Sequence, residues 1–256
     1  MLDSRIAMSV IDPDQNVLLV LLFSTVAALL DAAGSLPFIG RTTVPAQWGG
    51  FSYALASGLM LGSGYILMVE GLGRTTMSVV AGAVLGVVYT YWTHVFSGTR
   101  ELDHRPADGS VAEYSIKFIL LNALHSAPEG VAIGVAMVVD IPLGIFVALA
   151  LAVHNIAEAI VLMELLRANR APLQHAAAIS VVTNVPQILM AIVTFAIVPA
   201  VPALLPWTLG FASGAMGYLV MTDLLPFSYA RAGRTGVALV VSLSAGAVVL
   251  LRGLLG

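Results

Sequence analysis

The stretches Leu121-Asn122-Ala123-Leu124-His125-Ser126-Ala127-Pro128-Glu129-Gly130 and His154-Asn155-Ile156-Ala157-Glu158 decide how this chain folds. Both place polar and ionisable side chains in the middle of long apolar segments. Of all 256 residues, 59% are hydrophobic and only 10% are charged, and the mean hydropathy is +0.97. Because a soluble domain usually carries about 25% charged residues, the chain is predicted to be an all-α polytopic membrane protein.

Charged residues and Pro- or Gly-rich breaks divide the sequence into eight apolar segments. Each segment is close to the roughly 20 residues that a helix needs to cross a bilayer. The predicted membrane-spanning helices cover residues 16–35, 49–69, 75–97, 112–138, 142–166, 174–198, 204–227 and 235–254. We therefore expect residues 1–256 to form a single transmembrane domain. Acidic residues outnumber Arg5 before the first segment, so it is expected to be a retained helix rather than a signal peptide.

Basic residues are distributed unevenly between the two ends of these predicted helices. With the N-terminus outside, eight basic residues fall on the inner side and three, Arg5, Arg74 and Arg252, on the outer side. Cytoplasmic loops are enriched in Lys and Arg, so both termini are predicted to lie outside. The lack of cysteine removes disulfides and thiolate metal sites. A net charge of −3 gives no reason to expect nucleic acid as a partner.

Two carboxylates, Glu129 and Glu158, and two imidazoles, His125 and His154, lie near the middles of the fourth and fifth predicted helices. An ionised carboxylate there costs about 2.5–3.5 kcal/mol, and no Lys or Arg lies at that depth. The compensating positive charge is expected to be a cation, a proton or both. Each His–Glu pair is four residues apart and shares a helix face. The short connection 140–142 makes the helices antiparallel neighbours, so both pairs are expected to meet at one point.

Such a mixture of nitrogen and oxygen ligands suits Zn²⁺, Fe²⁺, Mn²⁺ or Co²⁺. Asn122, Ser126 and Asn155 add polar groups beside the ionisable ones. Pro128 has no N–H to offer the carbonyl of Leu124 and is expected to kink the helix. A carbonyl freed in this way is tolerated in a membrane only where it faces protein or a polar cavity.

Two other functions fit the same residues. An intramembrane hydrolase would use the metal to activate water, although the His-Glu-x-x-His pattern of metalloproteases is absent. A metal-free, proton-handling network would instead keep the carboxylates protonated and hydrogen-bonded to Asn122, Ser126 and Asn155.

The remaining ionisable residues are expected to be solvated or interfacial. The three other histidines lie near inner helix ends or loops and are expected to be solvated: His94, His104 and His175. Five carboxylates lie at the ends of predicted helices and are expected to be interfacial: Asp31, Glu70, Glu113, Glu164 and Asp223. For Asp31 and Asp223, a minor role in lining an exit path is the alternative.

The segment 56–60, Ala-Ser-Gly-Leu-Met, is echoed by 212–216, Ala-Ser-Gly-Ala-Met, and an acidic residue follows each, Glu70 and Asp223. The two predicted helices cross the membrane in opposite directions, as an inverted repeat requires. Packing of small residues between membrane helices is the alternative explanation of the match.

The segment 125–130 resembles the His-Asn-x-Pro-Glu-Gly signature of the ZIP family of divalent metal transporters, and 154–159 resembles its second copy. The predicted eight helices and outward termini also resemble the family's architecture, so the resemblance covers nearly the whole chain. It implies a helical bundle in which an inverted repeat, helices 1–3 and 6–8, surrounds helices 4 and 5. It further implies the following metal ligands: His125, Ser126, Glu129, His154, Asn155, Glu158 and Met60.

Some positions depart from the family pattern. Ser126 offers a hydroxyl where the family has an amide, and Ala157 and Ala159 replace Pro and Gly. Some members bind a second metal through an Asp and a Glu, for which this chain has only Asn155 and, on the sixth helix, Asn184 and Gln187. A second metal at that place is expected to bind weakly or not at all.

The expected function is that of a secondary transporter, not an enzyme, that moves a divalent cation toward the cytoplasm. Zn²⁺ is the favoured cargo, with Fe²⁺, Mn²⁺, Cd²⁺ and Co²⁺ as alternatives. The expected partners are the metal ion and the lipid bilayer of a bacterial inner membrane. Pairing into a homodimer and coupling to protons are left open by the sequence.

Overall fold

The computed structural model describes residues 13–97 and 111–255, which form helices and, within those ranges, no strands. The first half of the chain contains α1 (Pro13–Leu30), the 3-10 helix η1 (Asp31–Phe38), α2 (Ala46–Leu72), α3 (Thr76–Ser97) and α4 (Val111–Val139). The second half contains α5 (Ile141–Ala168), α6 (Leu173–Thr183), α7 (Val185–Ala200), α8 (Leu204–Leu219), the π-helical turn η2 (Val220–Leu224), α9 (Leu225–Ala232) and α10 (Arg234–Leu255). Arg5 and His104, named in the sequence analysis, lie outside the described ranges, as do Arg100 and Arg105, two of the eight basic residues counted on the inner side.

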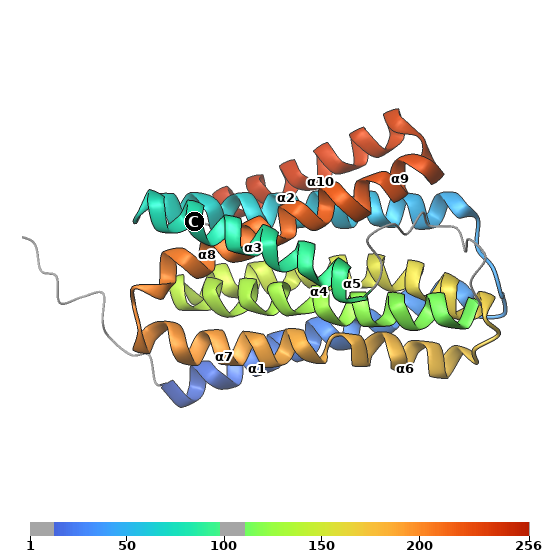
Figure 1. Ribbon diagram of the computed structural model, residues 1–256, viewed down its shortest axis with the longest axis horizontal. Coiled ribbons are helices and arrows are strands. Elements are labelled where there is room, and N and C mark those ends of the chain that lie inside the picture. The colour runs from blue at the N-terminus through green and yellow to red at the C-terminus, as the bar shows by residue number, and fades with distance from the viewer. Residues whose placement is uncertain (1–12, 98–110, 256) are drawn as a thin grey trace, which may run out of the picture.

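Eight segments of the described chain are long and apolar enough to cross a membrane, which confirms the predicted number and places of the spans. The fourth and fifth of them, in α4 and α5, are the most buried inside the protein, and the last, in α10, is the least buried. Figure 1 shows α4 and α5 in the middle layer, with α1, α6 and α7 on one side and α2, α3, α8 and α10 on the other. The outer helices expose Leu, Val and Ile side chains, as a lipid-facing surface requires.

Three of the eight spans are not continuous α-helices. The first changes from α1 to the 3-10 helix η1 at Asp31, and the seventh contains the π-helical turn η2. The sixth, expected as one helix over 174–198, is interrupted at Asn184. Pro186 explains that interruption, because a proline has no N–H to continue the hydrogen-bond ladder from α6 into α7. The 3-10 helix η1 packs against α5, and both parts of the sixth span pack against α4, whereas η2 packs against α2.

Pro128 lies inside α4 and leaves the carbonyl of Leu124 without its usual helical donor. The hydroxyl of Tyr89, on α3, donates a hydrogen bond of 3.0 Å to that carbonyl. The carbonyl group of Leu124 therefore faces protein, as expected from the sequence. The hydrogen bond that it accepts from Tyr89 also holds α3 against α4.

Glycines bring two pairs of helices into close contact. Gly58 and Gly62 of α2 lie against α10, and Gly210 and Gly214 of α8 lie against α3, so closely that a Cβ would overlap the neighbouring helix. Small residues spaced in this way let membrane helices approach. The second span thus packs on the eighth, and the seventh packs on the third. These two contacts are equivalent in an inverted repeat that relates helices 1–3 to helices 6–8.

Gly214→Ala is expected to lower the melting temperature of the detergent-solubilised protein, because the new methyl group would overlap the carbonyl oxygen of Ala83. Overpacking of this kind costs about 1–3 kcal/mol. Gly217→Ala, on the same helix but with nothing within 4 Å of its Cβ position, is the control and is expected to leave the melting temperature unchanged or higher. Equal effects of the two substitutions would contradict close α3–α8 packing.

Candidate metal centre

The connection between α4 and α5 sets the two helices side by side. Asp140 is the only residue between them, and its carboxylate accepts a hydrogen bond from the backbone N–H of Leu143 at the start of α5. Pro142 occupies the first turn, where its missing N–H is not needed. Because the chain reverses within so few residues, the middle of α5 lies beside the middle of α4.

Glu129 of α4 meets His154 and Glu158 of α5 in a group that we call the carboxylate cluster. The Nε2 atom of His154 lies 3.2 Å from Oε1 of Glu129 and 3.5 Å from Oε2 of Glu158. All three residues are buried, with 1% or less of Glu129 and His154 exposed. Ligand atoms from the three residues lie within 4.8 Å of one another, close enough to hold one metal ion.

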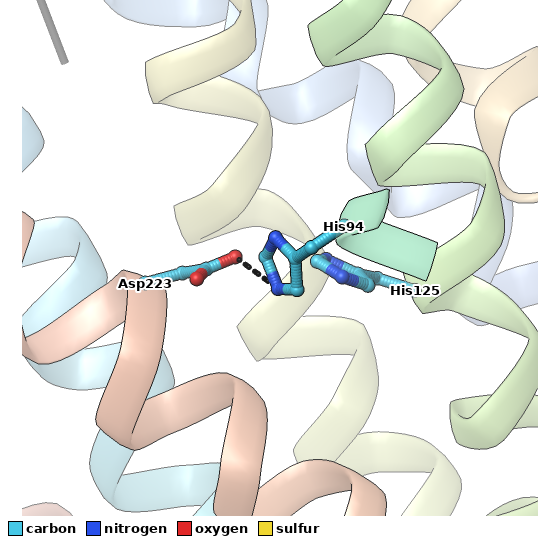
Figure 2. Close-up of side chains that lie close together, drawn as sticks. All are labelled: His94, His125 and Asp223. Carbon is cyan, nitrogen blue, oxygen red and sulfur yellow. Dashed lines mark ion pairs between the residues drawn. The ribbon is translucent and has the colours of Figure 1, made fainter. Parts of the chain in front are cut away.

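His125 is not part of this cluster, contrary to the expectation that both His–Glu pairs meet at one point. Its imidazole lies instead beside His94 of α3 and Asp223 of η2, and these three residues form what we call the histidine cluster (Figure 2). Four residues advance a helix by about 6 Å and turn it about 40° beyond a full turn. That offset is enough for Glu129 to reach α5 while His125 reaches α3.

The histidine cluster contains two residues whose environment was predicted wrongly. His94, expected to be solvated, is 8% exposed, and its Nε2 lies 3.3 Å from Oδ2 of Asp223. Asp223, expected at the interface, is partly buried against that imidazole. Hydropathy places both residues near the ends of their spans, and nothing in the local sequence says that α3 and α8 pack so closely.

Asp31 is a third residue whose environment was predicted wrongly. It was expected at the interface, yet only 1% of it is exposed, and its carboxylate accepts a hydrogen bond from Ser180 of α6. The pair joins the irregular part of the first span to the sixth. His175, in contrast, is exposed as expected.

Ser126 is engaged with backbone rather than with the carboxylate cluster. Its hydroxyl lies 2.9 Å from the carbonyl oxygen of Thr183, the last residue of α6, and 3.0 Å from that of Ala123. Asn122, one turn earlier, donates a hydrogen bond of 3.0 Å to the hydroxyl of Thr183. These contacts fasten α4 to the interruption of the sixth span. The role of Ser126 as a metal ligand stays a prediction.

Asn155 links three spans at the level of the carboxylate cluster. Its side-chain amide lies 2.9 Å from Oε1 of Gln187 on α7 and 3.1 Å from the carbonyl oxygen of Ala27 on α1. Its own Oδ1 is buried and has no hydrogen-bond partner among the described residues. Where some family members have acidic ligands for a second metal, this chain therefore has a hydrogen-bonded pair of neutral amides, Asn155 and Gln187. The role of Asn155 as a metal ligand stays a prediction.

Met60 lines a narrow cavity next to His125. The other residues around that cavity are Thr90, Pro128, Ala215, Met216 and Leu219. Met60 and Met216 are the last residues of the two echoed segments, so the two halves of the chain bring equivalent thioethers to one place. Whether Met60 contacts a metal stays a prediction.

Glycine and alanine at the two motifs are explained by packing. A Cβ on Gly130 would overlap the carbonyl oxygen of Gln187, so only glycine lets α7 lie this close to α4. At the second motif Ala159 replaces the glycine of the family pattern, and Gly34 of η1 lies directly against it. A Cβ on Gly34 would overlap the methyl group of Ala159, so glycine is needed on η1 for this close contact.

Within the described residues, the fold thus has the eight apolar spans of an integral membrane protein, with two buried clusters of ionisable side chains beside its central helices. Residues 93–251 match the family model of the ZIP zinc transporters. Over 229 residues the chain is 30% identical to a protein of Arabidopsis thaliana described as a candidate zinc transporter, which covers 88% of this chain and 37% of the plant protein. Over 196 residues it is 32% identical to the zinc transporter GufA of Myxococcus xanthus, covering 70% of this chain and 77% of that protein.

This chain belongs to the ZIP zinc transporter family. The chain spans little more than a third of the length of the plant protein and about three quarters of the length of GufA. Membership in a family of transporters identifies the chain as a transporter rather than an enzyme and sets aside the intramembrane hydrolase considered above.

Ser126→Ala is expected to lower the melting temperature, because the carbonyl of Thr183 loses a donor at the interruption of the sixth span. Loss of such a partner costs about 1–3 kcal/mol. The rise in melting temperature on adding Zn²⁺ is expected to be unchanged. Ser228→Ala is the control, because that buried hydroxyl bonds only to a carbonyl of its own helical segment. A lost response to Zn²⁺ in Ser126→Ala alone would instead assign Ser126 to the metal.

Proposed function

We propose that this chain is a secondary transporter that carries divalent transition-metal ions, Zn²⁺ above the others, across the membrane toward the cytoplasm. In this proposal Glu129, His154 and Glu158 hold the ion in transit between α4 and α5. The observation that carries the proposal is the burial of two carboxylates around one imidazole in the interior of a membrane protein.

The charges of the carboxylate cluster favour binding of a divalent cation. Oε2 of Glu129 and Nδ1 of His154 are buried and have no hydrogen-bond partner among the described residues. Buried polar atoms are almost always paired, so these two atoms in one place support a partner that binds there. Two carboxylates neutralise a divalent cation, whereas a single protonated imidazole neutralises only one of them.

The distances fit a small metal ion. Bonds of about 2.0–2.2 Å to nitrogen and oxygen in a tetrahedral site place neighbouring ligand atoms roughly 3.3–3.5 Å apart. The 3.2 and 3.5 Å separations in the carboxylate cluster are close to that spacing. Three protein ligands leave a coordination position for water, and an incomplete shell favours release of the ion over permanent binding.

The direction of transport is proposed from the ends of the helices. Arg167 donates a hydrogen bond to the carbonyl of Arg41, and Arg231 pairs with Glu164 at 2.5 Å. These contacts support one common end of the bundle for Arg41, Arg167 and Arg231, which the enrichment of basic residues makes the cytoplasmic end. Both termini would then face the outside of a bacterial inner membrane.

The choice of Zn²⁺ rests on the relatives and on the ligands. GufA is named a zinc transporter, and imidazole with carboxylate is a common ligand set for Zn²⁺. The same ligands accept Fe²⁺, Mn²⁺, Cd²⁺ and Co²⁺. Asn155 and Gln187 bring no charge, which supports a single metal at the carboxylate cluster. Movement of α4 and α5 relative to the outer helices would expose the ion to the other side.

Glu129→Gln, His154→Ala and Glu158→Gln are each expected to reduce Zn²⁺ uptake into proteoliposomes by about tenfold or more, because each removes a ligand from a three-residue site. Glu70→Gln is the matched control, since Glu70 is a partly exposed carboxylate at the end of α2. Wild-type uptake by all three cluster variants, with normal amounts of folded protein, would refute the site.

Unlabelled Zn²⁺, Cd²⁺, Co²⁺, Fe²⁺ and Mn²⁺ can each be tested as inhibitors of labelled Zn²⁺ uptake. Because His154 supplies a nitrogen ligand, Zn²⁺ and Cd²⁺ are expected to be the strongest inhibitors. Mg²⁺ and Ca²⁺ prefer all-oxygen sites and are expected to inhibit little. Strong inhibition by Mg²⁺ would mean that His154 is not a ligand.

A further inference from the structure

Glu164 of α5 and Arg231 of α9 form an ion pair at the end of the bundle that the proposed function makes cytoplasmic. Nη1 of Arg231 lies 2.5 Å from Oε2 of Glu164. The ion pair joins the fifth span to the last part of the seventh, and α9 lies at the same end of the bundle as the turn from α5 to α6 (Figure 1). Neither residue belongs to the carboxylate cluster or to the histidine cluster.

The start of α2 lies directly beside this ion pair. A Cβ on Gly49 would be 3.2 Å from Oε2 of Glu164 and 3.4 Å from Nη1 of Arg231, so a side chain there would crowd both charged groups. A Cβ on Gly50 would overlap the methyl group of Ala232 at the end of α9. The two glycines therefore let α2 approach α5 and α9 closely, and the ion pair crosses the contact between α5 and the other two helices.

Aromatic rings orient Arg231 toward α5. Its guanidinium lies over the ring of Phe227, one turn earlier on α9, with Cζ 4.2 Å from the ring centroid. The ring of Phe227 in turn packs against Tyr53 of α2, with 4.7 Å between the centroids, and both aromatic residues are buried. Because the face of an aromatic ring attracts a cation, this arrangement holds the guanidinium where Nη1 meets the carboxylate of Glu164.

The interior next to the ion pair is apolar. Glu164 lies six residues, about 9 Å along the helix axis, beyond Glu158 on α5. Between these two carboxylates, Leu162 and Met163 are fully buried, and they belong to the same hydrophobic core as Tyr53. Apolar side chains offer a metal ion no ligands to replace its lost hydration. A passage from Glu158 to this end of the bundle between α5 and α2 therefore opens only if α5 separates from α2 and α9.

From these observations we infer that the ion pair of Glu164 and Arg231 is a cytoplasmic gate. It holds α5 against α2 and α9 while the ion is bound in the carboxylate cluster, and it opens when the ion is released. This inference rests on the proposed function, since it assigns a moving contact to that transport. Glu164 and Arg231 do not bind the ion; they act through the position of α5, which carries His154 and Glu158.

The partial exposure of the ion pair fits a contact that breaks and forms again. The side chains of Glu164 and Arg231 are each 26% exposed, so the separated charges can return to water at this end of the bundle. Breaking a fully buried ion pair leaves an uncompensated charge in the protein interior, whereas a fully exposed pair contributes little. The half-buried pair lies between these limits: it stabilises the closed arrangement and still separates during transport.

The accessibility of a buried thiol measures how often the gate is open. The chain has no cysteine, so Ser57→Cys introduces a single thiol on α2. Ser57 is 0% exposed and lies one turn from Tyr53 on the same helix face. Labelling by a membrane-impermeant maleimide from the cytoplasmic side is expected to be slow. Glu164→Gln or Arg231→Gln is expected to accelerate it about tenfold or more, the effect of losing a hydrogen bond between charged groups.

The double variant Glu164→Gln with Arg231→Gln is expected to be labelled no faster than the faster single variant, because either substitution alone removes the ion pair. Arg234→Gln, at an exposed position on α10, is the matched control and is expected to leave labelling slow. Ser24→Cys, equally buried but on α1, is the control thiol. Unchanged labelling in the single variants, additive acceleration in the double variant, or equal acceleration at Ser24→Cys would overturn the gate.

A cleavable cross-link tests whether the pair must open for transport. Glu164→Cys with Arg231→Cys, joined by a short bis-methanethiosulfonate reagent, is expected to lose Zn²⁺ uptake into proteoliposomes by about tenfold or more relative to the same protein without the link. Zn²⁺ binding in equilibrium dialysis is expected to persist, and reduction of the link is expected to restore uptake. Glu164→Cys alone, treated with the same reagent, is the control. Full uptake by completely linked protein would overturn the gate.

The outcomes separate this inference from the proposed function. If the wild type takes up Zn²⁺ and the linked protein does so equally well, the gate is wrong and the proposed function stands. If the wild type takes up no Zn²⁺, the proposed function fails, and the labelling of Ser57→Cys still decides whether the ion pair holds α5 against α2 and α9. Gel filtration of each variant confirms that it is folded.

Discussion

Two carboxylates buried around one imidazole are the constraint on which the rest of this structure depends. Glu129, Glu158 and His154 lie where water is excluded, and an ionised carboxylate in that environment costs about 2.5–3.5 kcal/mol unless a positive charge compensates it. The helices that carry them must therefore be surrounded by protein. This explains why α4 and α5 occupy the centre of the bundle, while helices with uniformly apolar outer faces, such as α10, meet the lipid.

The same exclusion of water governs the backbone around the site. Three carbonyl groups near interruptions or at the site accept hydrogen bonds from side chains of other helices: Leu124 from Tyr89, Thr183 from Ser126 and Ala27 from Asn155. Irregular backbone is tolerated at membrane depth only when protein satisfies it. These three hydrogen bonds thus hold α1, α3 and α6 to α4 and α5 at the level where the ion is proposed to bind.

The carboxylate cluster and the histidine cluster place ionisable side chains next to each other in an otherwise apolar interior. Glu129 and His125 lie one turn apart on α4 but face different neighbours, α5 and α3. The histidine cluster is therefore a second group of buried ionisable side chains beside the first, formed by α3, α4 and the seventh span.

The sequence alone determined the membrane class, the eight spans and the short turn that pairs α4 with α5, because hydropathy, proline and loop length act locally along the chain. It also determined that His154 and Glu158 share a helix face. Only the tertiary structure decided that His125 leaves this group for His94 and Asp223, and that Asp31 is buried against Ser180. Those partners come from distant segments, and the glycine contacts and interrupted spans that bring them together depend on how the helices pack against one another.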